Sequence, residues 1–292
     1  MNLDQKKEIT LLLLNYVQGF GSQKQAFALL NGVSEATGIA IVKNQWNGIS
    51  DAMWRNVGKQ IGWNERKSKL VETQDFNTMI LYLSIAKDHG ETFAVVGAAG
   101  SGKTYAGKWY ADQMKSKNVY YLECAEYWNK KYFLIELLSA MGRSSAGMNI
   151  YEMMNEVVSQ LRKQERPLII LDEVDKLRDE VMYFFITLYN KLHGICGIVW
   201  TSTDVIVGRV DKGINRNKKG FQEIKSRIGS RFIGLHGTNK SEVQKICEVN
   251  GITEVEDVNR IYNEYGGDLR RIDRNYIKKV ARETYSNLKK AI

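Results

Sequence analysis

Short apolar runs alternate with longer amphipathic stretches through the middle of this chain. Runs rich in β-branched and aromatic residues predict five strands, at residues 92–96, 119–122, 167–171, 196–200 and 232–235. Good helix formers around them predict helices at residues 103–114, 132–141, 150–162 and 179–193. Because the run at 167–171 is apolar without interruption, we expect its strand to lie in a parallel sheet covered on both faces. The middle of the chain therefore has the pattern of an α/β domain.

Both ends of the chain have only helical periodicity. The predicted helices lie at residues 10–17, 23–30, 35–43, 75–87, 241–249, 255–265 and from 269 toward 290. The polar stretch at 65–69 predicts a linker, and the stretch at 237–239 begins a new unit. We therefore divide the chain into an amino-terminal helical domain (1–68), an α/β domain (69–236) and a carboxy-terminal helical domain (237–292).

The composition is that of an ordinary globular protein with a basic balance. Of 292 residues, 43% are hydrophobic and 26% are charged, which excludes a disordered chain. The single proline, Pro167, favours a helix-rich fold with few rigid turns. The formal net charge of +9 favours a polyanionic partner, although a basic surface that serves only solubility would give the same value.

Cysteine usage and hydropathy predict a soluble, cytoplasmic protein. Cys124, Cys196 and Cys247 lie far apart without the spacing of metal ligands, and three cysteines cannot all pair, which favours reduced thiols. The apolar run at 11–14 is too short to span a membrane, and no cleavable signal precedes it. We therefore expect no membrane partner.

A glycine-rich loop stands between the first predicted strand and the helix that follows. Its residues form the pattern of a phosphate-binding loop, the Walker A motif: Gly97, Ala98, Ala99, Gly100, Ser101, Gly102, Lys103 and Thr104. Glycines allow backbone N–H groups to turn inward around a polyphosphate, with the positive end of the helix behind them. Lys103 would contact the outer phosphates and Thr104 would offer its hydroxyl to Mg²⁺. The loop therefore predicts ATP and Mg²⁺ as cofactors.

Two acidic residues follow the apolar strand at 167–171. Asp172 and Glu173 form a Walker B pattern, because the carboxyl end of a parallel strand points at the ligand crevice. Asp172 would hold Mg²⁺ through its water shell and Glu173 would polarise the attacking water, although the pair could instead cap a helix. At the end of the fourth strand Thr203, with Ser202 as the second choice, would contact the γ-phosphate or the water, unless it only begins a polar loop.

A basic stretch with glycines precedes the last predicted strand. Its cations are Arg209, Lys212, Arg216, Lys218, Lys219, Lys225, Arg227 and Arg231, and only Asp211 and Glu223 oppose them in the sequence. Because glycines stand at 208, 213 and 220, we expect much of this stretch to be a flexible loop. Such a loop would bind the DNA backbone largely independently of base sequence, through Arg209, Lys212, Arg216, Lys218 and Lys219. The alternative is a loop that is merely solvated.

The segment 22–37 resembles the helix-turn-helix domains of phage repressors. Its sequence is Ser-Gln-Lys-Gln-Ala-Phe-Ala-Leu-Leu-Asn-Gly-Val-Ser-Glu-Ala-Thr, with Ala28 where the helices would cross closely and Gly32 at the turn. Gly38 departs from the Ile or Val usual in that family and costs about 1 kcal/mol of helix propensity. Exposed candidates for DNA contact are Ser34, Glu35, Thr37 and Lys43. The alternative is a small helical domain that binds protein or packs on its neighbour.

A second turn near the carboxy terminus is also basic. Gly267-Asp268-Leu269-Arg270-Arg271 puts two guanidinium groups in the first turn of the last helix, where they oppose the helix dipole and indicate an anionic partner. Together with both Walker motifs, the polar strand end and Ser230-Arg231-Phe232, this turn resembles AAA+ ATPases, nearest to their replication-initiator branch. With the repressor-like domain ahead of it, nearly the whole chain resembles the phage Mu B-type transposition ATPases.

This resemblance implies a fold and a set of partners. The fold is an AAA+ P-loop NTPase whose five-stranded parallel sheet has the order 5-1-4-3-2, followed by a helical lid. Nucleotide would lie at subunit interfaces, where Arg227 or Arg231 would act on a neighbour's ATP as the arginine finger, and Arg270 would act in its own subunit as the sensor-2 arginine. Such proteins assemble on double-stranded DNA as ATP-bound helical filaments, deliver target DNA to a transposase and disassemble on hydrolysis.

The leading hypothesis is an ATP-dependent, largely sequence-nonspecific double-stranded DNA-binding ATPase that serves transposition. A helicase loader would share the ATPase core but prefer single-stranded DNA or a helicase. A transcription regulator would instead recognise an operator through residues 34–43 and use nucleotide as a switch.

Overall fold

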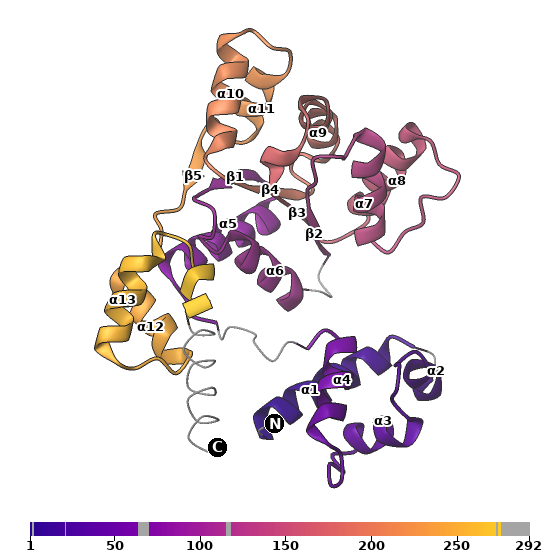
Figure 1. The fold of residues 1–292 in the computed structure, drawn as a ribbon. Helices are drawn as coiled ribbons and strands as arrows, with labels where there is room; N and C mark the ends of the chain where they lie inside the picture. Colours follow the sequence, from indigo (N-terminus) through magenta and orange to yellow (C-terminus); the bar gives the residue numbers. More distant parts are fainter. Residues whose placement is uncertain (2, 21, 64–69, 115–117, 273, 276–292) are drawn as a thin grey trace. The chain divides into compact units, whose positions relative to one another are not determined.

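The structure is a computed structural model that describes residues 1, 3–20, 22–63, 70–114, 118–272, 274 and 275. The chain divides into two compact units, Met1–Lys69 and Leu70–Ile292, whose elements are labelled in Figure 1. The predicted linker at 65–69 and most of the predicted last helix lie outside the described residues. Within the described ranges, every helix is too short or too polar to cross a membrane.

The first unit is helical. It contains α1 (Leu3–Gln18), α2 (Gln23–Ala28), α3 (Glu35–Val42) and α4 (Asp51–Gln60). Three of these helices begin after a serine whose hydroxyl accepts a hydrogen bond from a backbone N–H of the first turn: Ser22, Ser34 and Ser50. Their apolar faces enclose a core that includes Ile9, Leu13, Phe27, Ile41 and Trp54. The predicted start of the first helix at residue 10 is wrong, because its polar first turns carry little hydrophobic periodicity.

Helices α2 and α3 approach each other at Phe27 and Gly38, and not at Ala28 as predicted. Ala28 is exposed, so the predicted crossing at Ala28 is wrong. Gly38 is buried instead, and a Cβ atom on it would lie 2.6 Å from a ring carbon of Phe27. Glycine at 38 therefore makes room for the Phe27 ring, which explains why α3 tolerates a poor helix former in its middle.

The second unit is built on a parallel sheet. Its strands are β1 (Thr92–Val96), β2 (Val119–Glu123), β3 (Leu168–Asp172), β4 (Gly197–Ser202) and β5 (Phe232–Gly234). All neighbours pair in parallel in the order β2-β3-β4-β1-β5, which confirms the predicted order 5-1-4-3-2. The crossover connections bring the carboxyl ends of β1, β3 and β4 to one edge of the sheet.

Helices cover both faces of this sheet (Figure 1). Helices α5 (Gln74–His89) and α6 (Lys103–Gln113) pack on Val95, Ile170 and Val199. On the other face lie α7 (Lys130–Ala140), α8 (Ile150–Arg162) and α9 (Asp179–Leu192), which enclose Ile169, Leu171 and Trp200. Strand β3 is fully buried, which is why its sequence is apolar without alternation.

The carboxy-terminal helices of this unit form a small core of their own. Helices α12 (Lys240–Val249) and α13 (Val255–Tyr265) enclose Val243, Cys247, Ile252, Val258, Ile261, Tyr265 and Ile272. Two carboxylates join them to α5: Glu242 accepts from the backbone N–H of Gln74 at 2.6 Å, and Asp75 accepts from those of His236 and Gly237. The predicted separate lid domain beginning at 237 stays a prediction.

Candidate nucleotide site and basic pocket

The glycine-rich loop connects the end of β1 to the start of α6. Gly100 and Gly102 have φ values of 79° and 92°, a left-handed conformation that side chains rarely adopt. Gly102 is the residue before α6, so the backbone N–H groups of the helix's first turn open onto the loop. Ala98 and Ala99 are exposed at its tip, and Thr104 is half-buried in the first turn. This geometry suits an anion at the helix amino terminus.

The side chain of Lys103 lies folded within the loop. Its Nζ donates to the carbonyl oxygens of Gly97 and Ala98 at 2.7 and 2.9 Å, and to Ser101 Oγ at 3.2 Å. Burial lowers the pKa of Lys103, against the opposing effect of the carboxylates of Asp172, Asp204 and Asp175. The ammonium group is therefore held by acceptors that phosphate oxygens can replace.

Asp172 is fixed at the sheet edge by donors from three directions. The hydroxyls of Thr201 and Tyr121 donate to Oδ1 and Oδ2, the latter at 2.6 Å, and the backbone N–H of Glu173 donates to Oδ1 at 3.0 Å. The Asp172 residue is only 1% exposed. The buried Asp172 carboxylate and the half-buried Thr104 hydroxyl are oxygen donors of the kind that Mg²⁺ prefers, with phosphates completing its coordination.

Glu173 has an unusual backbone. Its φ of 56° and ψ of 42° are left-handed, at a cost of about 1 to 3 kcal/mol for a residue with a side chain. Its carboxylate is 2.5 Å from Nζ of Lys176 and does not cap the short helix η1 (Val174–Lys176) that follows. The Glu173 side chain therefore makes no capping hydrogen bond in this structure and pairs with Lys176 instead.

The three polar residues at the end of β4 differ in their hydrogen bonding. Thr203 donates to Asp175 Oδ2 at 2.7 Å, whereas Thr201 contacts Asp172. The Ser202 hydroxyl is buried and has no hydrogen-bond partner among the described residues. Sequence reasoning missed Thr201, Tyr121 and Asp175. Their hydrogen-bond partners lie far away in the sequence, and no local motif indicates these contacts.

The turn before the last predicted helix contacts the glycine-rich loop directly. The backbone N–H of Leu269 donates to the carbonyl of Gly100 at 3.0 Å. Asp268 lies so close that a Cβ atom on Gly100 would be 2.0 Å from its Oδ1. Arg270 Nε donates to Asp268 at 3.0 Å, and the charge of Arg270 contributes to lowering the pKa of Lys103. The structure thus brings Arg270 to the loop, with Asp268 between Arg270 and Gly100.

The two candidate arginine fingers differ in their surroundings. Arg227 donates to Asn190 Oδ1 at 3.0 Å and to the Glu223 carbonyl at 3.1 Å, and it lies over the ring of Tyr189. Arg231 is exposed, and its side chain makes no hydrogen bond or ion pair with another described residue. Arg231 is therefore the more available of the two for a neighbouring subunit.

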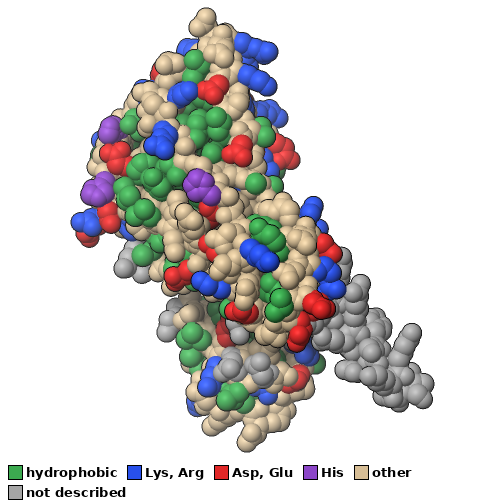
Figure 2. Space-filling view, turned by 90° about the vertical axis from the view of Figure 1, so that its left-hand side faces the viewer, with side chains coloured by type: hydrophobic (Ala, Val, Ile, Leu, Met, Phe, Trp, Pro, Cys, Tyr) green, Lys and Arg blue, Asp and Glu red, His purple; other side chains and the backbone are tan. Residues whose placement is uncertain are grey.

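The basic stretch is helical, so the predicted flexible loop is wrong. Residues Val205–Asn215 form α10 and Phe221–Arg227 form α11. A Cβ atom on Gly213 would lie 2.4 Å from the Phe221 ring, and Gly220, with φ of 88°, is the residue before α11. These glycines serve close packing and a helix start, two uses that a sequence does not distinguish from flexibility. Lys and Arg side chains gather over α10 and α11 at the top of Figure 2.

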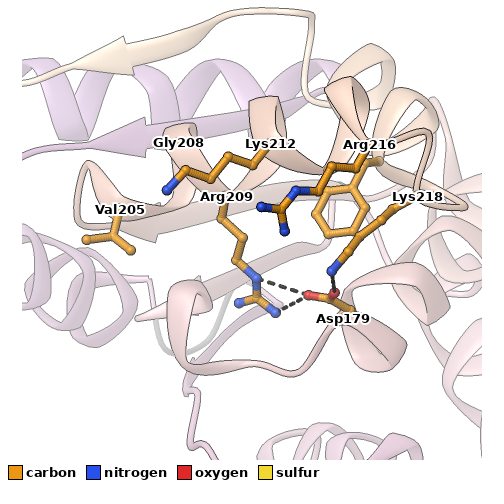
Figure 3. A pocket seen from close by; sticks show the side chains of 9 residues that line it. Asp179, Val205, Gly208, Arg209, Lys212, Arg216 and Lys218 are labelled. Carbon is orange, nitrogen blue, oxygen red and sulfur yellow. Dashed lines mark hydrogen bonds and ion pairs between the residues drawn. The ribbon is translucent and has the colours of Figure 1, made fainter.

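A basic pocket of about 510 Å³ lies among α9, α10 and α11. Its lining consists of Asp179, Val205, Gly208, Arg209, Lys212, Gly213, Arg216, Lys218 and Phe221. Figure 3 shows Arg209 and Lys218 converging on Asp179, at 2.5 and 3.2 Å. Burial raises the pKa of Asp179, but hydrogen bonds from Arg209 and Lys218 outweigh it and hold the pKa below its ordinary value.

The remaining predicted DNA contacts lie outside this pocket. Lys219 Nζ is 5.2 Å from the ring centre of Tyr183. Lys43 belongs to the first unit, where it is exposed at the end of α3. The structure therefore brings four of the six predicted DNA contacts together: Arg209, Lys212, Arg216 and Lys218.

The parallel sheet and its glycine-rich loop define this part of the chain as an AAA-type P-loop domain. Residues 86–202, from α5 to the end of β4, match the family described as AAA domain. The matched range contains the loop at 97–104 together with Asp172 and Glu173. This range, which is less than half of the chain, is therefore similar to an AAA domain.

Two solved structures are similar in fold. A DNA replication initiation factor is 15% identical with a TM-score of 0.48, covering 77% of this chain and 66% of its own. NtrX from Brucella abortus, in complex with ATP, is 13% identical with a TM-score of 0.48, covering 84% of this chain and 59% of its own. This chain thus spans less than two thirds of the length of either. No curated protein matches the sequence.

Proposed function

We propose that the protein is an ATP-dependent ATPase that binds double-stranded DNA largely without sequence preference, assembles on it and serves transposition. One observation carries the proposal: the candidate nucleotide site and a pocket with four cations are joined by a single side chain. Arg209 contacts Asp179 in the pocket and the backbone carbonyl of Asp175, three residues after Asp172. A charged surface tied to a nucleotide site is what nucleotide-controlled DNA binding requires.

The nucleotide roles are assigned by position. Backbone N–H groups of residues 97–104 would surround the phosphates, and Lys103 would exchange its loop carbonyls for phosphate oxygens. Thr104 and Asp172 would hold Mg²⁺, which when bound neutralises charge on the phosphates. Glu173 would orient and deprotonate the attacking water once Lys176 releases its carboxylate.

The assembly roles rest on exposure and charge. Arg231, exposed and without a partner among the described residues, would reach a neighbouring subunit's nucleotide, with Arg227 as the second candidate. Arg270 would act in its own subunit, since its turn already contacts Gly100. ATP would then favour a homo-oligomer or filament by completing the site between subunits.

The DNA and transposase partners have different support. The cations of the basic pocket, with Lys219 and Lys43 as outlying contacts, support phosphate-backbone binding. The transposase partner is supported by the resemblance in domain order alone. A cytoplasmic location is supported by three buried free thiols, Cys124, Cys196 and Cys247.

Binding of random-sequence duplex DNA at moderate salt, with ATP and separately with ADP, tests the proposal. We expect at least about tenfold tighter binding with ATP, within the range usual for coupled sites. Equal affinity with both nucleotides, or binding with neither, would refute it. Preference for single-stranded DNA would favour a helicase loader, and selection of one palindrome from random DNA would favour a transcription regulator. Electron microscopy of the ATP and DNA complex would show any filament.

A further inference from the structure

We propose that the basic pocket binds a backbone phosphate of duplex DNA and that Arg209 transmits its occupancy to the nucleotide site. The inference rests on the proposed DNA binding and adds to it a defined phosphate site and a route of regulation. Three observations support it: the positive charge of the pocket lining, the pairing of Arg209 and Lys218 with Asp179, and the contacts of Arg209 with Asp179 and with the Asp175 carbonyl.

The pocket lining has more positive than negative charge. Four cations line it, and Asp179 is the one carboxylate among the lining residues. The side chains of Lys212 and Arg216 make no hydrogen bond or ion pair within the described part of the chain. In Figure 3 the guanidinium group of Arg216 points toward the Arg209–Asp179 pair, whereas the Lys212 side chain extends toward Val205 on the other side of Arg209. A phosphate group offers the acceptors that guanidinium and ammonium groups pair with most strongly.

The pocket favours a backbone phosphate over a whole nucleotide. Phe221, the aromatic side chain of the lining, is only 3% exposed and Lys218 lies over its ring, so it offers no free face to a base. Nucleobases bind proteins largely by stacking on exposed aromatic faces. The two helices α10 and α11 instead present cations at a surface, which suits a chain of phosphates passing over it.

Arg209 is the link between the pocket and the nucleotide site. Its Nε and Nη2 donate to Asp179, and its Nη1 donates to the backbone carbonyl of Asp175 at 3.0 Å. Asp175 lies within η1, two residues after Glu173, and its carboxylate accepts from Thr203. The side chain of Arg209 is 26% exposed, so an anion in the pocket can reach it.

Asp179 occupies the place that a phosphate would take on Arg209 and Lys218. A phosphate that replaces Asp179 would shift the guanidinium and with it the contact to the Asp175 carbonyl. That contact belongs to the turn that follows Asp172 and Glu173, so the position of the candidate catalytic carboxylate responds to DNA. Coupling between two binding sites is reciprocal. If bound DNA changes the affinity for a nucleotide through this turn, that nucleotide changes the affinity for DNA by the same factor.

Two variants separate the affinity for DNA from the effect of bound DNA on ATP turnover. The double variant Lys212→Gln, Arg216→Gln removes the two unpaired cations but leaves Arg209 in place. We expect its affinity for labelled random-sequence duplex DNA with ATP to fall at least about tenfold, and the slope of log affinity against log salt to become shallower by about two. At saturating DNA its ratio of ATP turnover with DNA to turnover without DNA should equal the wild-type ratio.

Arg209→Gln should instead lose the effect of DNA on ATP turnover while keeping most of the affinity for DNA. We expect the turnover ratio at saturating DNA to fall to about one, with a salt slope shallower by only about one. Asp179→Asn should bind DNA more tightly than wild type, because it removes the anion that competes with phosphate. A purely structural role for Asp179 would not produce tighter binding.

The matched control is Lys163→Gln, Lys240→Gln, which removes two exposed lysines of the same unit away from the pocket. A double pocket variant that behaves like this control, or an Arg209→Gln protein with the wild-type turnover ratio, would overturn the inference while leaving DNA binding by the wild type intact. Absence of DNA binding by the wild type in every nucleotide state would overturn the proposed function as well. Inorganic phosphate at the same phosphate concentration should leave turnover unchanged; a change equal to that caused by DNA would overturn the assignment to DNA.

Discussion

The hydroxyl of Tyr121 donates a hydrogen bond of 2.6 Å to Oδ2 of Asp172. Space for the Tyr121 ring comes from α6, where a Cβ atom on Gly107 would lie 3.1 Å from it. Burial, followed by the charge of Asp172, raises the pKa of Tyr121, so the phenol remains protonated and a donor at neutral pH. Tyr121 therefore acts as a positioning residue that sets the orientation of the Asp172 carboxylate.

Replacement of Tyr121 by Phe keeps the ring and removes this donor. We expect the free energy of unfolding to fall by about 1 to 3 kcal/mol, and the Mg²⁺ concentration for half-maximal ATP turnover to rise several-fold. Tyr120→Phe is the matched control, because its hydroxyl donates to Gln164 at 2.8 Å, away from Asp172. The same Mg²⁺ requirement in both variants would show that Tyr121 has only a structural role.

Glu173→Gln tests the assignment of the general base. The amide keeps the size of the side chain but cannot accept a proton, so ATP should stay bound while turnover falls at least ~10²-fold. Glu180→Gln is the control, because Glu180 is an exposed carboxylate in the first turn of α9. Full turnover by Glu173→Gln in a single-turnover assay would exclude Glu173 as the base.

The two glycines of α10 should respond in opposite ways to alanine. Gly213→Ala would press a methyl group into the Phe221 ring and should destabilise the protein by about 1 to 3 kcal/mol. Gly208→Ala meets no atom within 4 Å and should stabilise it by about 0.5 to 1 kcal/mol through helix propensity. Urea unfolding of both variants provides the measurement. Neutral effects at both positions are the outcome expected of a flexible loop, and would contradict helix α10.

Local sequence signals predicted the strands and the glycine-rich turn between β1 and α6 well. Each strand is a short apolar run between helices, and its pairing order followed from the family resemblance. The error at 205–227 has a physical cause. Glycines in a basic stretch are typical of a flexible loop, which is why this stretch was predicted as one. In the structure, however, glycine at 213 leaves space for the Phe221 ring, and glycine at 220 allows the left-handed backbone before α11.

The partners of the site residues could not be predicted in the same way. Tyr121 and Thr201 lie 51 and 29 positions from Asp172, and only the sheet register brings them together. Asp179 is far from Arg209 in the sequence. Counting only the acidic residues within the basic stretch therefore overestimated the number of cations without an ion-pair partner. Side-chain pairs of this kind depend on tertiary packing, which residue periodicity does not encode.

The central claim is that residues 97–104 bind the phosphates of ATP. Equilibrium binding of labelled ATP with Mg²⁺ to the wild type and to Lys103→Ala tests it most directly. Lys108→Ala is the control, because Lys108 lies on the same helix but pairs with Glu123 at the surface. We predict that Lys103→Ala loses ATP binding and ATP-dependent assembly, whereas Lys108→Ala keeps both. Unchanged ATP affinity in a folded Lys103→Ala protein would contradict the claim.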